Sequence, residues 1–191
     1  NKRGLKMHKN SIVILDFGSQ YNQLIARRIR EKGVYAEIVP YFIEIEKLKA
    51  MNPKGIILSG GPASVYAEGS PRVSKEIYEL GVPVLGICYG MQLTSHLFGG
   101  EVLRADKQEF GKAELILDAP KDPIFYGIPE SSQVWMSHAD HVTRLPEGFE
   151  KIGHTDSSVA VIANRERTIY AVQFHPEVTH SGYGAQFLEN F

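Results

Sequence analysis

The first hundred residues alternate between short apolar, β-branched runs and stretches in which apolar side chains recur with helical spacing. The runs at residues 11–16, 34–39 and 55–58, and a fourth that begins at Val82, predict buried strands. A helical pattern follows each run. Because strand and helix alternate four times, this half predicts a parallel sheet with helices on both faces.

The third helical stretch has the clearest boundary signals. Ser70 is a preferred N-cap residue, and Pro71 suits the first helical position. Gly81 favours an end to the helix. The apolar stripe between them consists of Val73, Ile77 and Leu80. These signals predict a helix from Pro71 to the residue before Gly81.

The second half has short strand-like runs separated by turns that contain proline and glycine. They lie at residues 113–117, 133–136, 160–163 and 169–174. We expect them to extend the same sheet in antiparallel or mixed fashion, with a last helix from Gly182 onward. The predicted fold is α/β: an open, mostly parallel mixed sheet with helices on both faces, flavodoxin-like, in one domain over residues 11–191. Residues 1–10 are basic, lack the apolar core of a secretory signal, and are expected to be a lead-in or an expression remnant.

Composition narrows the class of partner and the cellular compartment. The 191 residues suit one domain, and the net charge of -1 gives no reason to expect a nucleic acid or a membrane surface as partner. No apolar run approaches the roughly 20 residues that span a bilayer. The single cysteine excludes an internal disulfide framework, so we expect a reducing, cytoplasmic setting.

That cysteine, Cys88, lies where the fourth predicted strand turns sharply into a helix. The pattern is the sulfur version of a nucleophile elbow, in which a reactive side chain sits on a strained strand-to-helix turn. Gly86 and Gly90 flank it, where a Cβ would crowd the backbone. The amides that open the following helix favour a thiolate.

A nucleophilic cysteine needs a base and a group that orients the base. His175 ends a predicted strand and Glu177 follows two residues later, so in extended backbone both side chains point the same way. Pro176 between them favours extended geometry at His175. An ordinary surface histidine and glutamate at a strand end would give the same pattern.

The reaction also needs donors for an oxyanion. Residues 59–62 leave the end of the strand that precedes the Cys88 strand, and the small Gly60 and Gly61 let backbone amides approach a substrate. We expect the amide of Tyr89 to be the second donor. A tight glycine turn with no catalytic role would give the same sequence pattern.

Several histidines could be mistaken for metal ligands: His138, His141, His175 and His180. A metal site is disfavoured because the chain has neither a His-Glu-x-x-His helix nor a second cysteine. Ser137 and His138 are better suited to present backbone and polar groups to a ligand. An ordinary polar loop at these two residues stays open as the alternative.

Three separated motifs, in order, resemble the class I (triad-type) glutamine amidotransferases: residues 60–62, 86–92 and 174–178. The resemblance covers essentially the whole chain from Ser11 onward. Within the family, residues 16–21, the residues beside Gly90 and residues 134–142 are most like the amidotransferase domains of GMP synthases. Asn22 departs from the threonine that is more usual there.

The resemblance implies a catalytic triad of Cys88, His175 and Glu177, which hydrolyses glutamine through a γ-glutamyl thioester. It implies an oxyanion hole from the amides of Gly61 and Tyr89. The implied glutamine-holding positions are Gly60, Gln92, Ser137 and His138.

The resemblance further implies that ammonia passes to an ATP pyrophosphatase (synthetase) domain or subunit, which aminates xanthosine monophosphate to GMP. The nucleotide loop of such a domain, Ser-Gly-Gly-x-Asp-Ser, does not occur in this sequence. We therefore expect no cofactor here, with ATP and magnesium only on that partner, and this chain to be either a separate subunit or part of a longer protein. Three alternatives are an amidotransferase for another acceptor, a γ-glutamyl hydrolase, and a flavodoxin-like binding module with a merely buried Cys88.

Overall fold

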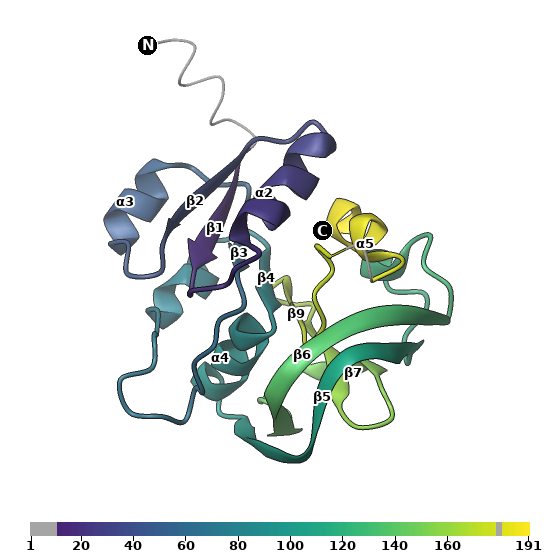
Figure 1. Ribbon diagram of the computed structural model, residues 1–191. Helices are drawn as coiled ribbons and strands as arrows, with labels where there is room; N and C mark the ends of the chain where they lie inside the picture. The colour runs from purple at the N-terminus through teal and green to yellow at the C-terminus, as the bar shows by residue number, and fades with distance from the viewer. Residues whose placement is uncertain (1–10, 179–180) are drawn as a thin grey trace.

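The computed structural model describes residues 11–178 and 181–191, with only the backbone described at 106–109 (Figure 1). Residues 1–10, and with them the expected lead-in, lie outside this range, as does His180. The described residues form a nine-stranded sheet in the order β2-β1-β3-β4-β9-β8-β7-β5-β6. Among them, no helix is long and apolar enough to cross a membrane.

The strands fall into a parallel part and an antiparallel part. The parallel strands are β1 (Ile12–Asp16), β2 (Ala36–Pro40), β3 (Gly55–Leu58), β4 (Val84–Ile87) and β9 (Ile169–Val172). The antiparallel strands are β5 (Glu101–Leu117), β6 (Ser131–Arg144), β7 (Glu150–His154) and β8 (Val159–Asn164). Strand β9 joins the two parts, since it runs parallel to β4 and antiparallel to β8. The expected mixed sheet is confirmed.

Helices cover both faces of the sheet, as the alternating pattern predicts (Figure 1). The α-helices are α2 (Asn22–Glu31), α3 (Ile45–Ala50), α4 (Tyr89–Leu97) and α5 (Gly184–Asn190), and the 3-10 helices are η1 (Lys75–Glu79) and η2 (Pro123–Phe125). One core cluster joins Ile14 and Leu85 of the sheet to Ile25 of α2 and Phe187 of α5. The other core cluster packs β1, β3 and β4 against α3, η1 and α4.

The predicted helix between Pro71 and Gly81 is wrong in type and length. Only η1 forms, and its N-cap is Ser74, whose hydroxyl accepts a hydrogen bond from the amide of Glu76. Ser70 instead donates to the carbonyl of Val65 at 3.2 Å, and the guanidinium of Arg72 donates to the same oxygen at 2.7 Å. These side chains hold the start of the segment as a loop, so the helix begins later than its boundary signals suggest.

The predicted short runs at 113–117 and 133–136 are parts of one long antiparallel hairpin, β5 and β6, which curves beside the parallel strands (Figure 1). A register shift between Arg104 and residue 109 interrupts the pairing. Ser137 and His138 therefore lie on a strand, not in a polar loop. At the other end, β9 stops at Val172, two residues before the predicted limit of 174.

Candidate active site

Cys88 is the single residue between the end of β4 and the start of α4. Its backbone has φ 53° and ψ -105°, which L-residues other than glycine rarely adopt. The amide of Cys88 donates to the carbonyl of Val172 on the neighbouring β9 at 2.7 Å, so the strand pairing fixes the turn. Strain of this kind persists only where surrounding contacts impose it, and it gathers at functional sites.

The two flanking glycines are required by close backbone approach. A Cβ on Gly86 would lie 2.6 Å from the carbonyl oxygen of Gly90, and a Cβ on Gly90 would overlap the carbonyl of Leu58. Only hydrogen fits at either position. The first turn of α4 therefore packs directly on β3 and β4, which places Cys88 at the carboxyl ends of the parallel strands.

His175 and Glu177 form a buried pair beside the elbow. Nδ1 of His175 lies 2.7 Å from Oε1 of Glu177, and both side chains are almost fully buried. Both residues follow the end of β9, and Glu177 lies in a turn, so His175 is not on the strand that it was expected to end. The turn is held by His175 itself: its amide donates to the Trp135 carbonyl, and its carbonyl accepts from the hydroxyl of Ser181.

The charge state of His175 follows from its neighbours. Burial, the largest influence, lowers the pKa of the imidazole. The hydrogen bonds to Cys88 and Glu177, together with the negative charges of both, outweigh burial and raise the pKa of His175 to about 10. His175 is therefore an imidazolium at neutral pH and a suitable counterion for a thiolate. The ring of Tyr21 meets the His175 ring edge-on, with 5.3 Å between centroids.

This pKa predicts a pH-dependent contribution to folding stability. Because the pKa of His175 is raised above its ordinary 6.5, the contribution is fully present below about pH 6.5 and is lost as the pH rises through about 10. We expect the difference in unfolding free energy between the wild type and His175→Asn to shrink across that window. Urea unfolding of both proteins at several pH values measures it; a difference that does not change with pH would contradict the assignment.

Gly60 lies directly against Cys88 and His175. A Cβ on Gly60 would lie 3.2 Å from Cε1 of His175 and 3.4 Å from Cβ of Cys88. Ser59 anchors the loop, since its hydroxyl accepts from the amide of Phe17 at 3.1 Å. The loop and the first amide of α4, that of Tyr89, thus flank Cys88 from two elements.

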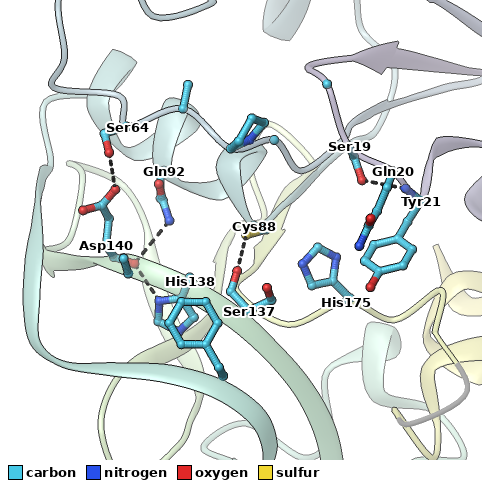
Figure 2. A pocket seen from close by; sticks show the side chains of 16 residues that line it. Ser19, Gln20, Tyr21, Ser64, Cys88, Gln92, Ser137, His138, Asp140 and His175 are labelled. Carbon is cyan, nitrogen blue, oxygen red and sulfur yellow. Dashed lines mark hydrogen bonds between the residues drawn. The ribbon is translucent and has the colours of Figure 1, made fainter.

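A cavity of about 410 Å³ opens above Cys88 (Figure 2). Its walls come from three segments that are distant in sequence: residues 18–21 after β1, residues 61–64 after β3, and residues 137–140 of β6. Of the predicted site residues, it is lined by Gly61, Cys88, Gln92, Ser137, His138 and His175. Glu177 lies behind His175. The structure therefore brings these six predicted residues together at one cavity large enough for an amino acid, whereas Gly60 and Tyr89 do not line it.

Sequence reasoning missed Asp140, which organises one wall of the cavity (Figure 2). Its carboxylate accepts from the hydroxyls of Ser64 and Tyr66, each at 2.7 Å. Its backbone carbonyl accepts from Nε2 of Gln92 at 3.2 Å and lies 2.6 Å from Nδ1 of His138. Asp140 therefore ties the loop after β3, helix α4 and strand β6 together. Its proximity in sequence to His138 was the available signal.

The histidines do not assemble into a metal centre in the described part of the chain. Over residues 11–178 and 181–191, no group of three His, Cys, Asp or Glu side chains could hold a metal ion. The Nδ1 atom of His138 instead faces the backbone of Asp140, and Nδ1 of His175 faces Glu177.

Comparisons with known proteins show the family of this chain. The family model for glutamine amidotransferase class-I matches residues 13–191. The chain is 60% identical over 185 residues to the glutamine-hydrolysing GMP synthase of Fusobacterium nucleatum, and 59% identical over 186 residues to that of Aquifex aeolicus. Each match covers 97% of this chain and 36% of the relative, so the chain spans about a third of the length of these relatives.

Solved structures agree with the family match. One is a Thermoplasma acidophilum protein that is provisionally named as a GMP synthase subunit. It is 36% identical to this chain, with a TM-score of 0.86, and the match covers 96% of this chain and 92% of that protein. A glutamine amidotransferase of Thermotoga maritima, 20% identical, shares the fold with a TM-score of 0.73 over 90% of this chain and 77% of that one. The resemblance seen in the motifs is confirmed: the chain belongs to the class-I glutamine amidotransferase family.

Proposed function

We propose that this domain hydrolyses glutamine to glutamate and ammonia, and that the ammonia aminates xanthosine monophosphate to GMP on a synthetase partner. The observation that carries the hydrolytic part is the arrangement at the cavity floor. Cys88 sits on a strained elbow, and the pKa of His175 beside it is raised, against burial, by its contacts with Cys88 and with Glu177, the latter at 2.7 Å. An acyl-transfer nucleophile needs such an adjacent base and a group that orients the base.

In the first half of the reaction, the Cys88 thiolate attacks the γ-carbonyl carbon of glutamine and forms a C–S bond. The carbonyl π electrons move to oxygen, where the amides of Gly61 and Tyr89 donate to the oxyanion. Nδ1 of His175 is engaged by Glu177, so Nε2 gives its proton to the amide nitrogen. The C–N bond then breaks, ammonia leaves, and a γ-glutamyl thioester remains on Cys88.

In the second half, neutral His175 takes a proton from water, and the resulting hydroxide attacks the thioester carbon. The C–S bond breaks, its electron pair returns to sulfur, and the new γ-carboxylic acid releases its proton to solvent as glutamate leaves. The thiolate–imidazolium pair is thereby restored. Glu177 stays ionised throughout and keeps the imidazole oriented.

We propose that glutamine itself is held by Gly60, Gln92, Ser137 and His138. Ser137 and His138 line the cavity from β6, and Gln92 lines it from α4. The Gln92 amide nitrogen is already fixed by the Asp140 carbonyl, so its side chain is oriented before substrate arrives. A preset wall of this kind reduces the conformational entropy lost on binding.

Substitution of Gly61 tests the oxyanion loop. A Cβ at Gly61 would overlap the carbonyl of Phe17, so Gly61→Ala forces the loop away from Phe17 and displaces the Gly61 amide. We expect glutamine hydrolysis to fall by about 10- to 100-fold, mainly in kcat, as when one oxyanion donor is misplaced. Gly182→Ala is the control, since its Cβ meets only an ordinary contact at 3.9 Å. Equal activity of the two variants would contradict the role of Gly61.

The proposal that xanthosine monophosphate is the ammonia acceptor is tested by adding a synthetase subunit. We propose that the partner is the ATP pyrophosphatase part of GMP synthase, and that ATP and magnesium bind there with no cofactor in this domain. The chain is mixed with a synthetase subunit that forms GMP from xanthosine monophosphate, ATP and ammonium. We expect GMP formation to become glutamine-dependent with wild type but not with Cys88→Ala. No glutamine-dependent product, with the ammonium reaction intact, would overturn the proposed acceptor.

A further inference from the structure

Gln173 lies within hydrogen-bond reach of the nucleophilic sulfur. It follows the last residue of β9, its side chain is fully buried, and its Nε2 lies 3.6 Å from Sγ of Cys88. It does not line the cavity. Substrate can therefore bind and leave while this contact persists. Neither the motifs nor the proposed mechanism gives Gln173 a role.

The Cys88 sulfur requires different hydrogen-bond partners as a thiol and as a thiolate. As a thiol, Cys88 donates toward the carbonyl of Ser137, 3.7 Å away. A thiolate cannot donate and is repelled by that oxygen, so it needs donors. The imidazolium of His175 is one, and the amide N–H of Gln173 is a second, neutral donor. The other titratable groups along the cavity are Tyr21, His138 and Asp140.

The backbone on either side of the Gln173 side chain is held by hydrogen bonds. The backbone amide of Gln173 donates to the Ala160 carbonyl at 2.8 Å, and the carbonyl of Val172 accepts from the Cys88 amide. A carbonyl oxygen turned toward a thiolate would be repelled, so the orientation with Nε2 at the sulfur is the one that ionised Cys88 selects.

The amide oxygen of Gln173 argues against a purely structural role. Within the described residues, Oε1 is buried without a hydrogen-bond partner. Burying an amide oxygen in this way destabilises a fold, and an apolar side chain of similar shape would avoid that cost. The N–H contact to Cys88 is the feature that an apolar residue would lose.

We propose that Gln173 is a further catalytic residue, whose side-chain N–H donates to the Cys88 sulfur and stabilises the thiolate. The proposal deepens, and rests on, the proposed hydrolysis of glutamine. The donor acts twice. It lowers the energy of the resting thiolate, and it stabilises the sulfur when the electron pair of the breaking C–S bond returns to that atom in the second tetrahedral intermediate.

The test is the rate of Cys88 alkylation by iodoacetamide between roughly pH 4 and 10, without glutamine. Gln173→Met removes the donor at similar size, and Gln173→Glu replaces the donor with a carboxylate. We expect alkylation at neutral pH to be about 10-fold slower in the Met variant and slower still in the Glu variant. Glutamine hydrolysis should fall about 10-fold in kcat, with KM within about twofold of wild type.

Ser95→Ala is the matched control. It removes a buried side-chain hydrogen bond, from the Ser95 hydroxyl to the Met91 carbonyl, away from the sulfur and the cavity. Its alkylation profile should equal that of wild type. A wild-type profile in Gln173→Met would overturn the proposal; if that variant does not fold, an unshifted profile in Gln173→Glu would do so. Alkylation needs no glutamine. If the proposed hydrolysis of glutamine is wrong, this appears in a separate measurement, because wild-type protein then releases no ammonia from glutamine.

Discussion

Cys88→Ala is expected to reduce ammonia release from glutamine by at least about 10³-fold, because no other group in the cavity can form the thioester. The fold should survive, since the change only shortens a side chain at a turn that is held by the Cys88 amide and the flanking glycines. Cys88 is the chain's single cysteine, so no second thiol can substitute for it.

The measurement is glutamate and ammonia production by purified protein, with calorimetric titration of glutamine in parallel. Cys88→Ser is the matched variant, because it keeps the side-chain shape with a much weaker nucleophile. We expect both variants to bind glutamine and neither to hydrolyse it at an appreciable rate. Hydrolysis by Cys88→Ala at the wild-type rate would remove Cys88 from the mechanism.

His175→Asn is expected to lower kcat by about 10³-fold, since the variant has no group to move protons between sulfur, leaving ammonia and water. Asparagine is chosen because its side-chain amide can still donate to Glu177, which would otherwise be a buried carboxylate without its partner. The variant also loses the imidazolium beside Cys88, so alkylation of Cys88 at neutral pH should slow together with glutamine hydrolysis.

The comparison uses His154→Asn as its control. His154 is a partly exposed histidine that pairs with Asp118 at 2.9 Å on the antiparallel part of the sheet. The His154→Asn variant should keep wild-type kinetics. The decisive readouts are kcat and the pH dependence of Cys88 alkylation. An unchanged kcat in His175→Asn, or an equal loss in both variants, would exclude His175 as the base.

The parallel half of the fold could be predicted from the sequence because its signals are local. Strands β1 and β3 are short, apolar on both faces and bounded by turn residues, and each was expected within one residue of its limits. The β5–β6 hairpin was expected only as fragments, because its pairing depends on partners far apart in sequence. The expected helix after Ser70 failed because side-chain contacts to the Val65 carbonyl hold a loop there.

The residues of the candidate site also divide into those that the sequence could predict and those that it could not. Cys88, His175 and Gly61 lie in compact motifs with turn residues around them, so sequence reasoning could single them out. Asp140 and Gln173 could not be found that way, because their roles arise from tertiary contacts. The Asp140 carboxylate meets Ser64 across 76 residues, and Gln173 meets Cys88 across 85.

The most direct test of the central claim uses a glutamine analogue in which a chloromethyl ketone replaces the side-chain amide. The Cys88 thiolate should displace chloride and form a thioether, and peptide mapping by mass spectrometry locates the label. We expect one label per chain, on Cys88, to form in proportion to the loss of glutaminase activity and to be blocked by glutamine. Full activity in protein labelled at Cys88, or activity lost through a label elsewhere, would contradict the account.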